Sequence, residues 1–464
     1  MTVTPELLAD ATPWNSGPLA PVAPVAPLAP VRIGPLGSED ALVLSGPTAA
    51  AGTEDLAGHR SRWGALPFHD GAAVRSLLRD SRLDGRGGAG FLLGRKVETA
   101  LLAPGRPVLI VNASESEPES RKDRTLCRYR PHLVLDGAAL LARSLGVDEV
   151  VLHAHRGTGS PSGPLSLAVI DRVRAGEPDP AWHLSEGPDR YVAGESSAVA
   201  SFVDQGEARP LFISHPLAVV GPSGSPTVVA NAETVAQLAV AARIGAVAWN
   251  ALGAPSSPGP RLVTLVGAVP RPGEVLELTG QGTIGDLLAA AGVTAAPAAV
   301  LVGGFAGTWV RGDEAWQTPF TRESLHCMGA SPGCGLLGVL PHDACPLRET
   351  ARIVRYLAGE SAGQCGSCVA GLPRLAAGLD ALAAGTARRR AVAKLDALGD
   401  SVFGSGACAH PDGVVRLVRS TLAVFDDDVA RHLAGGPCRG SDHPPVLAVP
   451  DARTSPITDG AAWR

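Results

Sequence analysis

The spacing of apolar residues predicts the first domain of the chain. An i, i+3, i+4 spacing predicts a helix over 73–80. Short apolar runs at 107–111 and 149–153 are typical of strands, and a helical pattern over 133–144 lies between them. A strand–helix–strand unit implies parallel pairing of the two strands. We therefore expect an α/β domain with a parallel sheet over residues 51–254.

The pattern changes after a Pro- and Ser-rich linker. Apolar runs at 262–266 and 274–278 flank a Pro-Arg-Pro-Gly turn, which predicts a hairpin. A helix and a strand follow, so we expect a small β-grasp domain over residues 261–335. Helical spacing then dominates residues 336–436 and predicts a helical bundle.

The two ends of the chain lack such patterns. Residues 1–50 contain the Pro/Ala-rich run APVAPVAPLAP, which is typical of a stiff, extended leader without a core, and we expect them to be mostly disordered. Residues 437–464 are rich in Pro, Asp and Ser and predict a flexible tail.

Composition narrows the class of protein. The 464 residues are 45% hydrophobic and 18% charged, which is typical of globular domains. A net charge of −5 argues against nucleic acid or an anionic membrane as the main partner. We expect no signal peptide and no transmembrane segment. Eight cysteines are few for this length, so reduced thiols in the cytoplasm are expected instead of a disulfide framework.

A glycine-rich loop, GRGGAGF from Gly85 to Phe91, is the first candidate site. Glycines accept positive φ angles and let a backbone approach a ligand closely. The loop satisfies G-x-G-x-x-G, but it follows a predicted helix, whereas a dinucleotide fingerprint follows a strand. Two of only three lysines, Lys96 and Lys122, lie beside or soon after it. The alternative is a flexible surface turn.

Polar residues follow the predicted strand at 107–111. In open α/β sheets, ligands bind outside the carboxyl ends of the strands. Asn112, Glu115 and Glu117 are therefore expected to face the glycine loop, although a solvated acidic loop is the alternative. Further along, the turn at Gly194 and Glu195 precedes a helix start that could bind a phosphate or present a carboxylate.

Three cysteines form the second candidate site. Cys365 and Cys368 have CxxC spacing, and Cys408 follows with His410 close behind. A redox pair would need a thioredoxin-like context, which is missing. An iron–sulfur cluster takes four thiolates, and only three are evident. A Cys₃His zinc site using His410 and a set of unrelated buried cysteines are the alternatives.

The remaining cysteines show no recognisable ligand spacing. We expect packing or surface positions for Cys127 and Cys438, and assign no role to Cys327, Cys334 and Cys345.

Six motifs together resemble the flavin-bearing, NADH-oxidising subunit of respiratory complex I. The same family includes the diaphorase subunits of NAD-linked hydrogenases and formate dehydrogenases. The resemblance extends from about residue 56 to residue 433. Its motifs are GRGGAGF at 85–91, NASESEP at 112–118, YVAGES at 191–196, NAETV at 231–235, VGGFAGTW at 302–309 and ESAGQCGSC at 360–368.

The resemblance implies a fold, cofactors and a reaction. It implies an FMN-binding α/β domain, a β-grasp (SLBB-like) domain and a helical bundle that holds a [4Fe–4S] cluster. NADH would deliver hydride to FMN, and single electrons would pass to the cluster or to a ferredoxin-type partner. The implied partner is a separate ferredoxin-like or thioredoxin-like iron–sulfur subunit, in the cytoplasm or peripheral to a membrane complex.

The resemblance also implies residue roles. Phe91 and Glu117 would lie on the nicotinamide–adenine side. The catalytic candidates are Glu115, Glu117, Tyr191 and Glu195. The cofactor-binding candidates are Gly85, Arg86, Gly87, Gly88, Gly90, Phe91, Lys96, Asn112, Ser116, Gly194, Asn231 and Thr234. The metal ligands would be Cys365, Cys368 and Cys408.

This chain departs from the family pattern at both sites. Ala362 replaces the first cluster cysteine, which leaves a [3Fe–4S] cluster, a [4Fe–4S] cluster with another ligand, zinc or no metal as alternatives. Ser114, Ser196 and Ser225 replace two acidic residues and a lysine on the nucleotide side. The alternatives to NADH oxidation are therefore a flavoprotein with another donor, such as NADPH or reduced ferredoxin, and a non-catalytic structural or assembly paralogue.

Overall fold

The structure is a computed structural model. It describes residues 30–67, 70–157, 159–212, 215–435, 438, 440, 443–451 and 460–464. The first part of the predicted leader, residues 1–29, lies outside the described residues.

The first domain contains a four-stranded parallel sheet, which confirms the predicted α/β fold. The strand order is β4-β3-β2-β5, and every neighbouring pair is parallel. The strands are β2 (Val108–Asn112), β3 (Glu149–His155), β4 (Ala181–Gly187) and β5 (Thr227–Asn231).

Alternate residues of these strands contribute to two apolar layers. Leu109 and Val111 of β2 belong to the core formed with α2 (Gly71–Ser81), α5 (Pro131–Leu145) and α8 (Ala232–Ala251). Ile110 between them packs instead with residues of α7 (Ser196–Gln205). The near-continuous apolar strands are therefore explained by burial on both faces.

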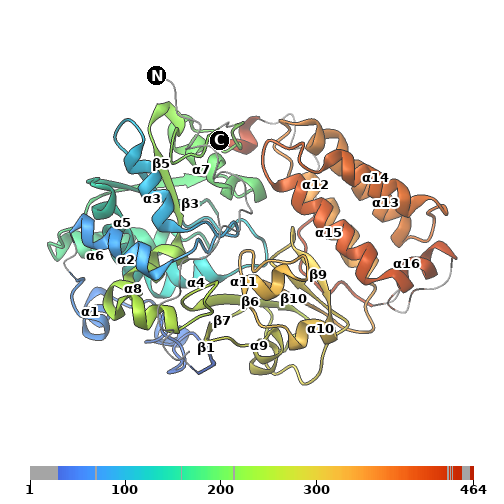
Figure 1. Cartoon of the computed structure of the whole chain (residues 1–464), viewed down its shortest axis with the longest axis horizontal. Helices are drawn as coiled ribbons and strands as arrows, with labels where there is room; N and C mark the ends of the chain where they lie inside the picture. Colours follow the sequence, from blue (N-terminus) through green and yellow to red (C-terminus); the bar gives the residue numbers. More distant parts are fainter. Residues whose placement is uncertain are drawn as a thin grey trace.

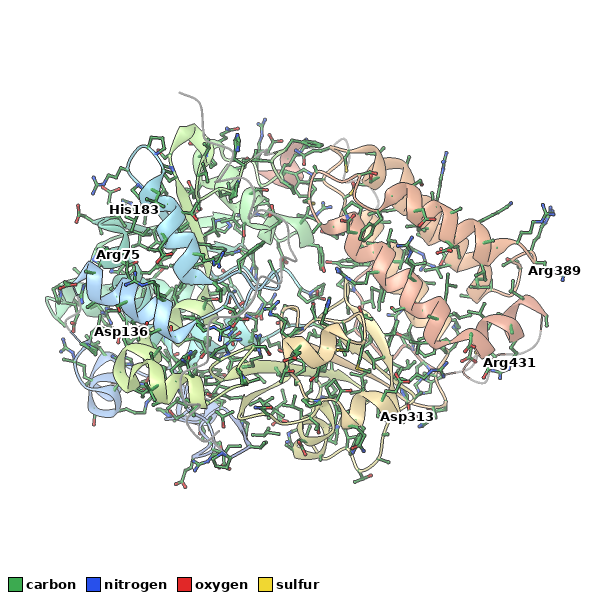
Figure 2. The ribbon with its side chains drawn as sticks, in the orientation of Figure 1. Arg75, Asp136, His183, Asp313, Arg389 and Arg431 are labelled. Atoms are coloured by element: carbon green, nitrogen blue, oxygen red, sulfur yellow. The ribbon has the colours of Figure 1, made fainter. Side chains whose placement is uncertain are left out.

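Further helices complete this domain. They are α1 (Leu56–Trp63), α3 (Leu93–Leu102), α4 (Lys122–Tyr129) and α6 (Ser162–Arg174). Asp136 of α5, labelled in Figure 2, is buried in this layer. Its carboxylate accepts hydrogen bonds from Arg172 Nη1 at 2.8 Å and pairs with His59 Nε2 at 2.9 Å, so it links α5 to α6 and α1.

The second sheet has six strands in the order β1-β7-β6-β10-β8-β9. The predicted hairpin is present as β6 and β7, which pair antiparallel. The strands are β1 (Arg32–Pro35), β6 (Arg261–Gly267), β7 (Glu274–Thr279), β8 (Ala299–Val302), β9 (Thr308–Arg311) and β10 (Leu336–Leu340). The helices associated with this sheet are α9 (Ile284–Ala290), α10 (Gly312–Gln317) and α11 (Arg322–His326).

The sheet extends beyond the predicted β-grasp range at both ends. β1 pairs antiparallel with β7, and the buried Glu277 carboxylate accepts backbone N–H bonds from Leu42, Val43 and Leu44, so this part of the leader is ordered. Such anchoring uses backbone groups and one distant carboxylate, which leave no hydrophobic period in the sequence. In addition, β10 belongs to the sheet, although residues 336–340 were assigned to the helical region.

The last region consists of packed helices (Figure 1, orange to red). They are α12 (Pro346–Gly359), α13 (Leu372–Ala383), α14 (Ala391–Val402), α15 (His410–Val424) and α16 (Asp426–Leu433). Their apolar faces form one core that extends to the strands β8 and β10 of the sheet. A short π-helical segment, Ser367–Gly371, leads into α13.

The segment after α16 returns to the first domain. Val446 and Leu447 donate backbone N–H bonds to Glu349, and the Trp463 ring is fully buried against Arg190, with 4.7 Å between the guanidinium carbon and the ring centroid. In Figure 1 the C-terminus lies close to α7. The prediction of a flexible tail is therefore wrong for these residues. A single buried side chain such as Trp463 produces no hydrophobic periodicity, so the sequence pattern does not predict its burial.

Among the described residues, no helix has both the length and the apolar character needed to cross a membrane.

Candidate active site

The glycine loop lies against the carboxyl edge of the parallel sheet. Asn112 and Asn231 stand opposite each other at the ends of β2 and β5. A Cβ atom on Gly87 would lie 3.3 Å from Asn231 Cβ, which is closer than most such contacts. Arg86 N donates to Thr234 Oγ1 at 2.8 Å. The loop is therefore placed at the ligand-binding edge, as the sequence predicts.

The loop is closed on itself and uses positive φ angles. Gly85 N donates to Phe91 O at 2.8 Å, and the loop joins α2 to α3. Gly88 and Gly90 have φ angles of +114° and +68°, which other residues adopt at a cost. The run of glycines is thus required by the backbone itself.

A second loop completes this edge. Asn112 Nδ2 donates to Gly194 O at 2.9 Å, and the Ser116 side chain packs directly against Gly194. Glu195 follows, and its carboxylate accepts backbone N–H bonds from Ser197 at 2.8 Å and Ala198 at 3.2 Å, which caps α7. The YVAGES motif is therefore held by its own helix start and by β2.

Lys96 and Phe91 offer a cation and an aromatic face. Lys96 Nζ is partly buried, donates to Val229 O at 3.2 Å and lies 6.0 Å from the Phe91 ring centroid. Burial lowers the pKa of Lys96, and the Glu195 carboxylate opposes that shift. The Phe91 side chain is 61% exposed. An exposed ring beside a partly buried ammonium suits a flat, anionic ligand.

The residues at this edge fit FMN in their donor chemistry. The Ser114 hydroxyl is buried there without a hydrogen-bond partner in the described structure. The loop amides and Lys96 supply donors for phosphate or ring oxygens. Asn231 and Thr234 instead serve the protein, because Asn231 caps α8 and Thr234 holds the loop. These two are positioning residues.

The acidic candidates have different surroundings. Glu115 accepts hydrogen bonds from Ser120 Oγ, Asp123 N and Arg124 N at 2.7–3.1 Å, so its carboxylate caps the start of α4. Burial raises its pKa, and the nearby Asp123 carboxylate raises it further. Glu115 is therefore committed to holding the NASESEP loop.

Glu117 links the first domain to the second sheet. Its carboxylate accepts hydrogen bonds from Tyr191 Oη and Phe305 N, each at 3.1 Å. Burial raises the pKa of Glu117 to about 8, although both hydrogen bonds oppose the shift. The side chain is therefore mostly protonated at neutral pH, in contrast to an ordinary surface glutamate.

Sequence reasoning missed an arginine that reaches the glycine loop from the second sheet. Arg322 packs against Gly90 and pairs with Asp84, with 2.9 Å between Nη2 and Oδ2. Arg86 and Arg261 also pair with Asp84, at 2.9 and 2.7 Å. Burial alone would raise the pKa of Asp84, but the three guanidinium groups hold it well below its usual range. No motif marks Arg322, since its partner is far away in the sequence.

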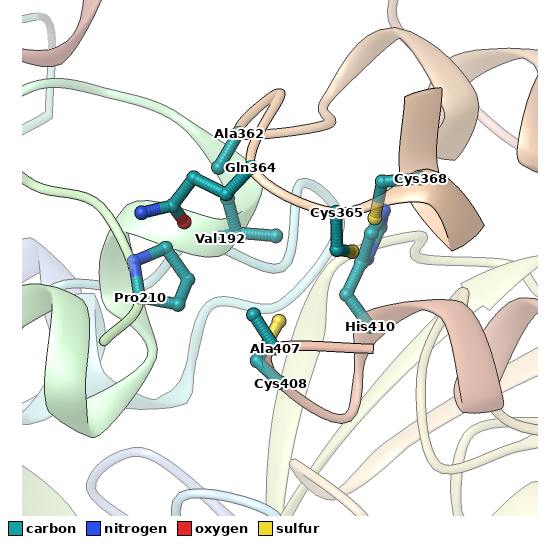
Figure 3. Close-up of a pocket in the computed structure, with 9 residues that line it drawn as sticks. All are labelled: Val192, Pro210, Ala362, Gln364, Cys365, Cys368, Ala407, Cys408 and His410. Atoms are coloured by element: carbon teal, nitrogen blue, oxygen red, sulfur yellow. The ribbon is translucent and has the colours of Figure 1, made fainter. Parts of the chain in front are cut away.

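The three predicted metal ligands meet in one pocket (Figure 3). Cys365 and Cys368 follow α12, and Cys408 precedes α15. Burial raises the pKa of the Cys368 thiol to about 12 and that of Cys408 to about 11. The pocket is lined by Val192, Pro210, Ala362, Gln364, Cys365, Cys368, Ala407, Cys408 and His410.

The pocket brings together three thiols and a histidine, although their ligand atoms do not all lie within 4.8 Å of one another. Ala362 lines it, so the methyl group stands where the family pattern has a cysteine. His410 Nε2 donates to Leu357 O at 2.9 Å, while the buried Nδ1 has no hydrogen-bond partner in the described structure. His410, which carries this unpaired Nδ1 atom, lines the same pocket as the three cysteines.

Tyr191 and Glu195 connect the two sites. The Tyr191 ring lies 5.5 Å from the His410 ring, while its hydroxyl reaches Glu117. Glu195 interacts electrostatically with Lys96 and also with Cys408. The Glu360 carboxylate accepts from Tyr191 N at 2.9 Å, just ahead of the cysteine loop. The glycine-loop edge and the cysteine pocket are therefore neighbours.

Both the glycine-loop region and the cysteine region of the chain match known protein families. Residues 78–240 match the Nuo51 FMN-binding domain, and residues 348–432 match the NADH-ubiquinone oxidoreductase-F iron–sulfur binding region. This chain is therefore similar to the F-type NADH-quinone oxidoreductase proteins in both regions. The predicted resemblance, the FMN domain and the iron–sulfur region are thereby confirmed.

Individual relatives give the extent of the similarity. The F-type NADH-quinone oxidoreductase protein of Mycobacterium tuberculosis is 29% identical over 79% of this chain and 85% of its own length. An F-type protein of the same enzyme in Rhizobium meliloti is 27% identical over 82% of this chain and 93% of its own length. A crystal structure of an NAD⁺-reducing [NiFe]-hydrogenase has a TM-score of 0.72 and 29% identity over 79% of this chain. The present chain spans 63% of that hydrogenase chain.

Proposed function

We propose that this protein is an NADH-oxidising flavoprotein that sends electrons through its cysteine centre to an iron–sulfur partner. One observation carries the proposal. The FMN-type edge and the cysteine pocket both border the Tyr191–Glu195 turn, because Gly194 O accepts a hydrogen bond from Asn112 Nδ2 and Val192 lines the cysteine pocket. A donor site and an outlet for single electrons are therefore adjacent.

FMN would supply hydride acceptance and one-electron release. The protein's own groups would bind and orient the ring. The loop amides and Lys96 would hold the cofactor, and the exposed Phe91 ring would provide a stacking surface for a nucleotide. Glu117, kept protonated by burial, would donate its proton in a hydrogen bond instead of repelling an anionic nucleotide.

The finer domain assignments support the same proposal. We infer that the six-stranded sheet contains the β-grasp (SLBB-like) module and that the packed helices are the cluster-binding bundle. We further propose a separate ferredoxin-like or thioredoxin-like iron–sulfur subunit as the electron acceptor. The cysteine centre would face that subunit, because electron transfer requires the two centres to be close.

Anaerobic titration of the purified full chain with NADH tests the proposal. We expect an FMN absorbance that NADH bleaches, with reduced iron–sulfur signals appearing in the EPR spectrum. Bound flavin that stays oxidised in NADH but is bleached by dithionite would overturn NADH as the donor. A colourless protein that does not bind added FMN would overturn the flavoprotein assignment itself.

Phe91→Ala tests the nucleotide side separately. The ring is mostly exposed, so its removal should leave folding and FMN content unchanged while raising KM for NADH by a factor of about 3–10. Phe403→Ala is a matched control, since that ring is also half exposed and lies in the helical region. Equal KM values in both variants would contradict a stacking role for Phe91.

A further inference from the structure

Three side chains outside the cysteine pocket come together at the far end of the packed helices. Cys345 Sγ, His432 Nε2 and Cys438 Sγ form the only described group of at least three such ligands in which all ligand atoms lie within 4.8 Å of one another. All three side chains are buried. In the sequence, 87 residues separate Cys345 from His432 and 6 separate His432 from Cys438, so the three do not form a recognisable ligand motif.

The distances suit a tetrahedral zinc ion. Zinc–sulfur and zinc–nitrogen bonds are about 2.3 and 2.0 Å long, and a tetrahedral angle between them separates the two ligand atoms by about 3.5 Å. The structure has 3.5 Å between Cys345 Sγ and His432 Nε2. The Cys345 and Cys438 thiols are also within hydrogen-bonding reach of each other.

Cys345 and His432 each contact backbone groups of neighbouring helices. Cys345 is the N-cap residue of α12, and burial raises the pKa of its thiol to about 12, although the backbone N–H groups of Leu347 and Arg348 oppose that shift. The His432 ring also hydrogen-bonds the backbone of Leu382 and Ala383. A metal-ligating histidine is commonly held by a carbonyl in this way, which leaves Nε2 free for the metal.

The backbone at Gly440 lies close to Cys345. A Cβ atom on Gly440 would overlap the backbone nitrogen of Cys345, so only glycine lets the segment come this close. A small pocket next to Cys345 is lined also by Arg348, Gly440 and His443. Two thiolates would neutralise the charge of Zn²⁺ in this buried place.

We propose that Cys345, His432 and Cys438 bind a structural zinc ion that fastens the C-terminal segment to α12 and α16. The site is separate from the pocket of Cys365, Cys368 and Cys408. Its ligands come from the start of α12, the end of α16 and the segment that follows. Beyond it, that segment continues to the contacts of Leu447 with Glu349.

Metal analysis of the full chain tests the proposal. Protein purified from zinc-containing medium with reductant should hold about one zinc ion per chain, in addition to any iron. His432→Gln and Cys438→Ser should each lower the zinc content at least about fivefold with iron and FMN unchanged. Cys327→Ser, at an exposed cysteine, is the matched control and should keep the zinc.

A second measurement covers variants that fail to fold. X-ray absorption at the zinc edge of the unchanged protein should show two sulfur ligands at about 2.3 Å and nitrogen or oxygen ligands at about 2.0 Å. Chelation should also speed proteolysis of the C-terminal segment, as the loss of a structural metal predicts.

Several results would overturn the proposal. These are absence of zinc from the unchanged protein, zinc that is lost in Cys365→Ser but kept in His432→Gln, and a coordination shell of three or four sulfurs. A Cys345–Cys438 disulfide in peptide mapping under non-reducing conditions would also overturn it.

Discussion

Glu117→Gln tests whether a buried, protonated carboxyl group links the first domain to the second sheet. Glutamine has the shape of the protonated acid and can keep the contacts with Tyr191 and Phe305. In the folded protein the pKa of Glu117 rises from 4.5 to about 8, because burial penalises the charged form. The folded state therefore binds this proton more tightly than the unfolded state does.

The stabilisation that Glu117 gives the folded protein therefore decreases as the pH rises. The contribution of the raised pKa is fully present below pH 4.5 and is lost as the pH rises towards 8. A shift of this size corresponds to at most about 5 kcal/mol, and about 3 kcal/mol of it falls between roughly pH 5.5 and 8. Glutamine does not titrate, so Glu117→Gln should gain stability relative to the unchanged protein as the pH rises.

Thermal unfolding across this pH range measures the effect. The difference in Tm between Glu117→Gln and the unchanged protein should widen by several degrees from about pH 5.5 to 8. Glu314→Gln, at an exposed position on α10, is the control and should give a constant difference. Parallel Tm curves for Glu117→Gln and the unchanged protein would refute a raised pKa at this position.

Three further predictions follow from the contacts described above. Cys365→Ala should abolish the iron–sulfur EPR signal but leave FMN bound, because the two sites lie in different regions; loss of both would contradict that separation. Gly90→Ala should weaken FMN binding about tenfold or more in fluorescence titrations, because the φ of +68° and the Arg322 guanidinium leave no room for a Cβ. Unchanged affinity would show that the loop does not bind FMN. Trp463→Ala should lower the unfolding free energy by about 3–5 kcal/mol, since the ring is fully buried against Arg190. An unchanged Tm would mean that the C-terminal segment is not docked in solution.

The helix before the glycine loop, the parallel strands and the hairpin were predictable because each depends on local spacing. The chemistry of the candidate sites was also predictable in kind. GRGGAGF needs glycine at its positive φ angles, and the Cys365–Cys368 spacing is set by the short turn that carries both thiols. These features depend on neighbours in the sequence, so they can be found in it.

The roles of individual acidic residues were not predictable. Glu115 and Glu117 are two positions apart and were given the same catalytic expectation. The structure turns Glu115 into a helix cap, whereas it buries Glu117 beneath Phe305, 188 residues away. Burial decides the protonation of Glu117, and burial is a property of the packed molecule.

The amino-acid sequence by itself determined the order of the elements, the flavin-type loop and the three-cysteine motif. Only the tertiary structure decided that Arg322 reaches the loop and that Tyr191 and Glu195 stand between the two sites. It also decided that Cys345, His432 and Cys438 meet. The physical reason is the same in each case. Periodicity and local motifs operate over a few residues, whereas these contacts join distant segments only after the hydrophobic cores of the three regions have formed.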